Sequence, residues 1–130
     1  MTTPPPVSAR PWWAFALDLA LVVAFVLVGR RSHAEGLDLQ GLLTTLWPFA
    51  AGLAAGWLSV LGARWPLPAL TSGAVVWVAT VVVGMLLRVA SGQGVQLSFV
   101  VVTIVVLAVF LLGWRAIARL VRRRGRATRA

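Results

Sequence analysis

The sequence predicts an all-α, polytopic membrane protein, a four-transmembrane-helix bundle with its N and C termini on the same, cytoplasmic side. Three observations predict this fold. Of the 130 residues, 60% are hydrophobic and only 12% are charged, whereas soluble domains carry about 25% charged residues. The apolar residues form four runs, each close to the roughly 20 residues that a helix needs to cross a bilayer. The segments between the runs are too short to fold as a separate domain.

The chain is expected to begin with a disordered tail over residues 1–11, where prolines cluster. The first span is expected at 12–29. It starts with two tryptophans, Trp12 and Trp13, at headgroup level, and only Asp18 interrupts it. A cleaved signal peptide is disfavoured, because two arginines directly precede the one small-residue cleavage site and the apolar run is long.

The second span is expected at 41–62, with small residues on one helix face. Gly52 and Gly56 stand four residues apart on that face, and small residues let a neighbouring backbone approach closely. Pro48 is placed near the start of this helix, where its missing N–H costs least. The second span is therefore expected to pack tightly on a neighbour.

The third span is expected at 69–87, after a turn that contains two prolines. Gly73 and Gly84 share one helix face with other small or polar residues, so both glycines are further helix-packing candidates. Arg88 continues that face one turn on. We therefore expect its side chain to point toward the bundle rather than toward lipid.

The fourth span is expected at 97–114 and completes a transmembrane domain over 12–114. Beyond it, arginines recur at helical spacing among apolar residues. They predict a basic amphipathic extension over 115–130, helical for a turn or two. Many residues of the last two spans are β-branched, as in strands. Strands are excluded nevertheless, because long continuous runs in lipid satisfy their backbone hydrogen bonds as helices.

The arginine distribution predicts the orientation. Four spans put both termini on one side, which collects nine of the twelve basic residues, all of them arginine: Arg10, Arg64 and seven from Arg115 to Arg129. The other side holds Arg30, Arg31 and Arg88. By the positive-inside rule we expect the termini in the cytoplasm, and the expected location is the plasma membrane. The first and third connections then meet at the outer end of the bundle.

These two connections supply the candidate ligand-binding site. Arginine offers forked donors suited to phosphate or carboxylate, and histidine acts as acid or base near neutral pH. The alternative is structural, with arginines capping helix C-termini and pairing with nearby acids. The candidates are Arg30, Arg31, His33, Glu35, Arg88 and Gln93, with Thr44, Thr45 and Gln96 as further possibilities.

Asp18 is the second candidate site, because an unpaired carboxylate inside a span costs several kcal/mol. Arg64 and Arg115 are its candidate partners on the cytoplasmic side. The group is either an intramembrane ion pair that locks the first helix to the fourth or part of a proton or cation relay. The structural alternative is slightly preferred, since no second intramembrane acid exists to continue a relay.

The composition also limits cofactors and partners. The chain has no cysteine and one histidine, so no metal, no cofactor and no catalytic residue is predicted. The arginines from Arg115 to Arg129 are expected to fix topology and to lie near anionic membrane lipid. They lack an aromatic stacking platform, so no nucleic-acid partner is expected. A homodimer or a larger membrane complex is possible.

Several short stretches together resemble one family. They are Gly29 to Gly36, Trp47-Pro48-Phe49, Arg88 to Gly94 with Ser98-Phe99, and Gly113-Trp114-Arg115. As a set they are similar to the family catalogued as domain of unknown function 3054, small four-helix membrane proteins of bacteria and archaea. The likeness covers most of the chain from Trp12 to Arg115. It implies the fold and the membrane location, but no activity.

Three functions fit the sequence. The first is a small-solute or ion transporter or channel-like protein with a polar site at the non-cytoplasmic face, in which a homodimer would enclose the pathway. The alternative is a non-catalytic accessory or assembly subunit of a membrane complex. The third is an enzyme that acts on lipid headgroups, with His33 or Glu35 in acid-base work. The enzyme ranks last, because nucleophiles are few.

Overall fold

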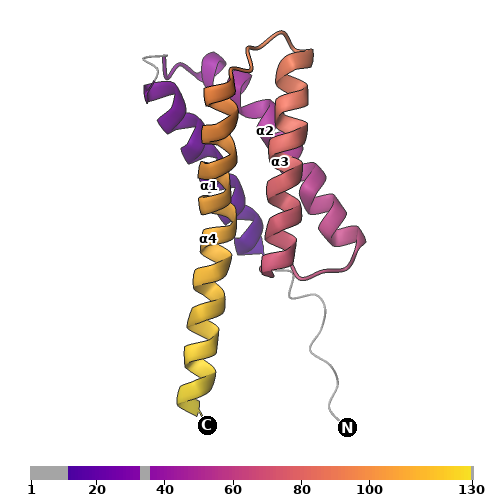
Figure 1. Ribbon diagram of the computed structural model, residues 1–130, viewed down its shortest axis with the longest axis vertical. Helices are drawn as coiled ribbons and strands as arrows, with labels where there is room; N and C mark the ends of the chain where they lie inside the picture. The colour runs from indigo at the N-terminus through magenta and orange to yellow at the C-terminus, as the bar shows by residue number, and fades with distance from the viewer. Residues whose placement is uncertain (1–11, 33–35, 130) are drawn as a thin grey trace.

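The computed structural model describes residues 12–32 and 36–129, so the tail expected over 1–11 lies outside the described residues. The described chain forms four helices: α1 (Trp12–Ser32), α2 (Leu39–Gly62), α3 (Leu70–Ala90) and α4 (Leu97–Arg129) (Figure 1). Each is long and apolar enough to cross a membrane. The predicted all-α, four-span fold is confirmed, and the protein is a multi-pass membrane protein.

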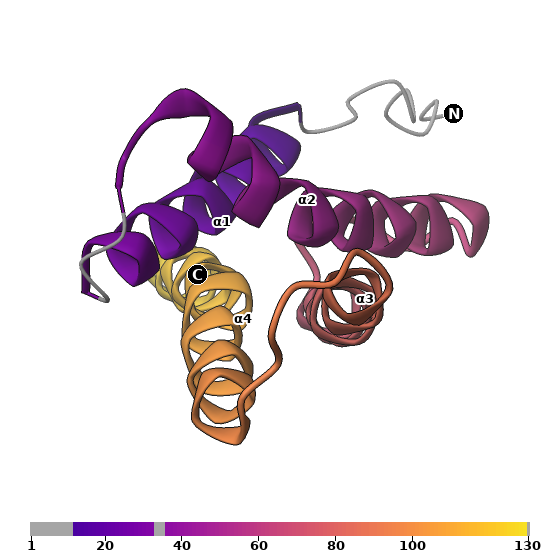
Figure 2. The ribbon, with the colours of Figure 1, turned by 90° about the horizontal axis from the view of Figure 1, so that it is seen from above.

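The helices run alternately up and down (Figure 1), so the α1–α2 and α3–α4 connections lie at one end of the bundle and the α2–α3 turn lies at the other. We call the first end the Arg30/Arg88 end, after the arginines near the ends of α1 and α3. Seen from above (Figure 2), α3 is viewed nearly along its axis, whereas α1 and α2 lie across the view and run in different directions.

Helix α4 continues beyond the bundle. It is a single helix of 33 residues that ends at Arg129, and its last part projects past the other three helices (Figure 1). We expected one or two helical turns after residue 114, but the helix extends further. The exposed side chains of this projection include both arginines and apolar residues, among them Arg119, Ile117 and Leu120.

Helices α2 and α3 pack closely because glycines line their contact. A Cβ atom at Gly52 would lie 2.9 Å from the Cα of Thr80, and one at Gly56 would lie 2.8 Å from the Cα of Val76. Real Cβ atoms essentially never approach backbone so closely. The two helices are therefore in backbone contact, as in other membrane bundles with small residues at the interface.

The two ends of α2 have identifiable local causes. Asp38 caps the N-terminus, since its carboxylate accepts a hydrogen bond from the Gly41 N–H at 3.1 Å. At the other end the chain turns sharply through Arg64, which has a left-handed φ of 60°. Pro48 lies inside the helix and is buried, about two and a half turns from Leu39. Our placement of this proline near the helix start was therefore wrong.

Candidate functional site

A cavity of about 680 Å³ lies at the Arg30/Arg88 end of the bundle, and all four helices contribute to its wall. Its size is within the roughly 300–1,000 Å³ of small-molecule sites. The polar residues that line it are Arg30, Thr44, Thr45, Arg88, Gln93, Gln96 and Ser98. Its apolar side chains are Phe25, Val26, Phe99 and Val102. We call this space the end cavity.

Arg30 is held in place by the start of α2 and by its own connection. Its Nε donates to the Gly36 carbonyl at 2.7 Å, and one terminal nitrogen donates to the Thr45 hydroxyl at 2.8 Å. The other terminal nitrogen lies 4.0 Å from the Asp38 carboxylate. The Arg30 side chain is only 13% exposed, so its charge has a fixed position at the cavity wall.

Arg88 is anchored in a similar way at the end of α3. It donates to the Gln93 side chain at 2.9 Å and to the Gly94 carbonyl at 2.8 Å. The guanidinium carbon also lies 4.5 Å from the ring centroid of Phe99, within the range of a cation–π contact. Arg88 thus points into the bundle, where it lies directly beside an apolar wall of the cavity.

The two arginines repeat one arrangement. Each stands in the last turn of its helix, and each donates through Nε to the carbonyl of a glycine six residues further on, Gly36 for Arg30 and Gly94 for Arg88. Each arginine therefore closes its own connection. Part of the hydrogen bonding of the two arginines therefore serves to hold the connections in place. Both arginines also line the same cavity.

Gln93 ties the α3–α4 connection to α2. Its amide nitrogen donates to the Thr44 carbonyl at 3.0 Å. Because Pro48 has no N–H, it cannot donate to this carbonyl four residues before it, as a helix residue normally would. Gln93 fills the vacant position, so the proline inside α2 creates the acceptor on which the loop docks.

The other candidates of this group are placed differently. Arg31 is exposed and is not among the residues that line the end cavity. His33 and Glu35 lie outside the described residues. Thr44, Thr45 and Gln96 do line the cavity. Phe25 and Val26 could not be selected from the sequence, since they are two of many apolar residues in the first span.

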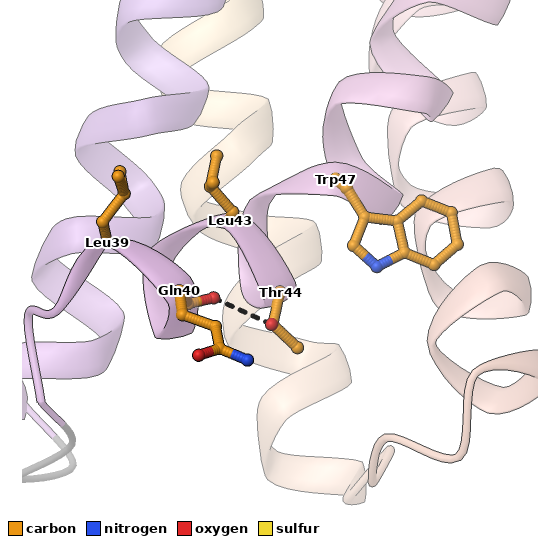
Figure 3. Close-up of a pocket in the computed structure, with 5 residues that line it drawn as sticks. All are labelled: Leu39, Gln40, Leu43, Thr44 and Trp47. Carbon is orange, nitrogen blue, oxygen red and sulfur yellow. Dashed lines mark hydrogen bonds between the residues drawn. The ribbon is translucent and has the colours of Figure 1, made fainter.

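A second hollow of about 570 Å³ lies beside the end cavity on the outer face of α2 (Figure 3). It is lined mostly by apolar side chains, Leu39, Leu43 and Trp47, together with Gln40 and Thr44. The Thr44 hydroxyl turns back to the Gln40 carbonyl at 2.8 Å. Thr44 lines both hollows, so the two spaces adjoin at this part of α2.

A fully buried ion pair lies toward the other end of the bundle. Asp18 and Arg115 are both 0% exposed, and two guanidinium nitrogens contact the two carboxylate oxygens at 2.9 and 2.8 Å. The indole N–H groups of Trp57 and Trp114 also donate to this carboxylate, at 3.0 and 2.8 Å. The carboxylate thus accepts four hydrogen bonds, which compensate for its burial.

Arg115 connects three parts of the chain at this point. Its Nε donates to the Leu67 carbonyl in the α2–α3 turn at 2.9 Å. Gly73 makes room for it, because a Cβ there would lie 2.5 Å from the Arg115 Cδ. Arg64, the other candidate partner of Asp18, is exposed in the turn, and the buried hydrogen bonds of Asp18 come from Arg115 and the tryptophans instead. These contacts fit an ion pair that holds α1, α4 and the α2–α3 turn together.

The fold and the end cavity define a class, that of small integral membrane proteins built as a four-helix bundle with a polar cavity at one end. Within this class the chain belongs to the family described as Protein of unknown function (DUF3054), whose model matches residues 15–118. The resemblance drawn from short motifs is confirmed. No curated protein and no solved structure matches the chain. Family membership supports the membrane assignment and assigns no activity.

Proposed function

We propose that this membrane protein is a small-solute or ion transporter or channel-like protein whose outer binding site is the end cavity. The observation that carries the proposal is the placement of Arg30 and Arg88, from the last turns of α1 and α3, on the wall of one cavity. Loop closure alone would not require both charges to face a shared space. In this proposal the cavity opens to the non-cytoplasmic side, and both termini lie in the cytoplasm at the plasma membrane.

The opposite end of the bundle supplies the closed side of such a pathway. Asp18, Arg115 and two tryptophans fill the space between α1, α2 and α4. A solute that enters the end cavity would therefore stop above this cluster until the helices move. Four helices enclose little space, so a homodimer is the form in which we expect the protein to act.

Flux into proteoliposomes tests the proposal, with chloride, phosphate, acetate and benzoate as probes. We expect protein-dependent flux of at least one of these anions and an at least tenfold reduction in Arg88→Gln, roughly the loss of one charge-assisted hydrogen bond. Arg119→Gln is the matched control, because Arg119 is exposed on the projecting part of α4. Equal flux in Arg30→Gln, Arg88→Gln and the unaltered protein would remove the cavity from the pathway.

A second candidate function, an accessory or assembly subunit, is favoured by the projecting part of α4. Ile117, Leu120 and Val121 are 64%, 58% and 64% exposed and lie among arginines, so this part of α4 has an amphipathic surface. Anionic lipid headgroups or an acidic partner protein would complement its charge. Isolation of the protein alone under mild detergent, with no associated subunit, would count against this function.

A further inference from the structure

We infer that the ligand of the end cavity is an amphipathic organic anion, with one carboxylate or phosphate group on an apolar body. This inference rests on the proposed function only in taking the same cavity as the binding site. It adds the chemical class of the ligand, which the transport proposal leaves open between inorganic ions and organic solutes.

The charge of the wall selects an anion. Two guanidinium groups, those of Arg30 and Arg88, line the cavity, and none of the described residues that line it is an acid. Asp38, which is not among these lining residues, lies 4.0 Å from Arg30 with a side chain that is 68% exposed, where solvent screens its charge. The hydrogen bonds to Gly36 and Gly94 fix both charges, so an anion meets donors that are already oriented.

The apolar part of the wall indicates that the ligand has an apolar body in addition to its charged group. Phe25 and Val26 are buried, and together with Phe99 and Val102 they form an apolar side of the same cavity. An inorganic ion would occupy only the polar part and would leave this side against water. The 4.5 Å contact between Arg88 and Phe99 puts the charged and apolar parts side by side, so one molecule can use both.

The adjoining hollow on α2 suggests how such a ligand arrives. Thr44 lines both spaces, and Leu39, Leu43 and Trp47 add exposed apolar surface on α2 (Figure 3). An amphipathic anion concentrates at the membrane surface, where its headgroup lies at the level of polar connections and its apolar part lies in the bilayer. The ligand is therefore either a soluble organic anion or an anionic lipid of the bilayer, which share this chemistry.

Equilibrium dialysis of radiolabelled octanoate tests the ligand class, with the protein in phosphatidylcholine nanodiscs and empty nanodiscs as the blank. We expect saturable binding that is at least about a hundredfold tighter than that of acetate or inorganic phosphate, because buried methylene groups add affinity. Octylammonium and 1-octanol should not compete. Equal binding of acetate and octanoate, or competition by octylammonium, would overturn the inference.

Variants assign the binding to the end cavity. Arg88→Gln should weaken octanoate binding at least about tenfold, while the control Arg119→Gln should retain it. Val102→Trp should abolish octanoate binding by filling the apolar side, whereas Val105→Trp, on an exposed position of α4 outside the cavity, should not. If Arg88→Gln fails to fold, the two tryptophan variants decide, and equal binding in both would overturn the assignment.

Two further comparisons distinguish a lipid ligand from a soluble one, and the proposed ligand class from the proposed transport function. Nanodiscs doped with phosphatidylglycerol should compete with octanoate if the ligand is a lipid, and should leave it unchanged if the ligand is a soluble anion. Octanoate binding without flux of any probe would refute transport and support the ligand class. Flux of chloride or phosphate without octanoate binding would support transport and refute the ligand class.

Discussion

At the scale of single residues, the Asp18–Arg115 pair makes the largest demand on its surroundings. Both side chains are fully buried, and removing two charges from water costs several kcal/mol per ion before any contact is made. Trp57, Trp114 and the Leu67 carbonyl supply the additional hydrogen bonds that offset this cost. The pair therefore depends on four separate segments of the chain being in place together.

Arg115→Met tests this dependence. The variant leaves the Asp18 carboxylate buried with only two indole donors, and loss of one partner of a buried pair costs roughly 3–5 kcal/mol. We expect a clear drop in the thermal unfolding midpoint in detergent. The double variant Asp18→Leu/Arg115→Met should be more stable than Arg115→Met, because it leaves no buried charge. A single variant as stable as the unaltered protein would show that the pair contributes nothing.

The residue scale also shows what the sequence could and could not predict. The candidate partners of Asp18, Arg64 and Arg115, followed from charge and topology, because both are arginines on the side of the bundle where Asp18 lies. The two tryptophan donors, Trp57 and Trp114, could not be predicted in this way, since a tryptophan in an apolar run is usually interpreted as an anchor at the membrane interface. Arg30 and Arg88 were candidates because their chemistry is rare in this chain. Phe25 belongs to the cavity only through packing, which no local pattern records.

At the scale of helices, the closest contact is the one between α2 and α3, where Gly52 and Gly56 of α2 lie against the backbone of Thr80 and Val76 in α3. Hydropathy predicted the helix positions to within a few residues, because the bilayer requires a fixed length of apolar helix. It did not predict how far α4 continues to Arg129. That part lies beyond the apolar run, so helix propensity and not hydropathy decides its end.

Gly56→Ala tests the α2–α3 contact, and Gly113→Ala is the matched control. At Gly56 the added methyl group would lie 2.8 Å from the Val76 Cα, whereas nothing lies within 4 Å at Gly113 in α4. We expect Gly56→Ala to destabilise the protein by about 1–3 kcal/mol through overpacking. Gly113→Ala should be neutral or stabilising, because alanine is the better helix former. Equal midpoints for the two variants would contradict the backbone contact.

At the scale of the whole molecule, the two ends of the bundle differ. One end holds a cavity with arginines in its wall, and the other is filled by a neutralised ion pair and tryptophans. The proposed orientation puts the cavity outside and the arginine-rich end of α4 in the cytoplasm. In the proposed function, the end with the cavity is the open side of the pathway and the filled end is its closed side.

Cysteine labelling in whole cells tests the orientation, and the chain provides a natural cysteine-free background. Ser91→Cys, in the α3–α4 connection, should react with a membrane-impermeant maleimide from outside. Ala63→Cys, after the end of α2, and Arg123→Cys, on the projecting helix, should react only after permeabilisation; all three positions are exposed in the structure. The reverse pattern would place the end cavity in the cytoplasm.

The most direct measurement is a structure determined with an ω-brominated octanoate, using anomalous scattering to locate the bromine. The proposed ligand class predicts a single strong bromine peak on the apolar side of the end cavity, near Phe25 and Val102, with the carboxylate between Arg30 and Arg88. The peak should disappear in Val102→Trp and persist in Val105→Trp. A bromine found only among lipids around the bundle, with the cavity unchanged, would contradict the account.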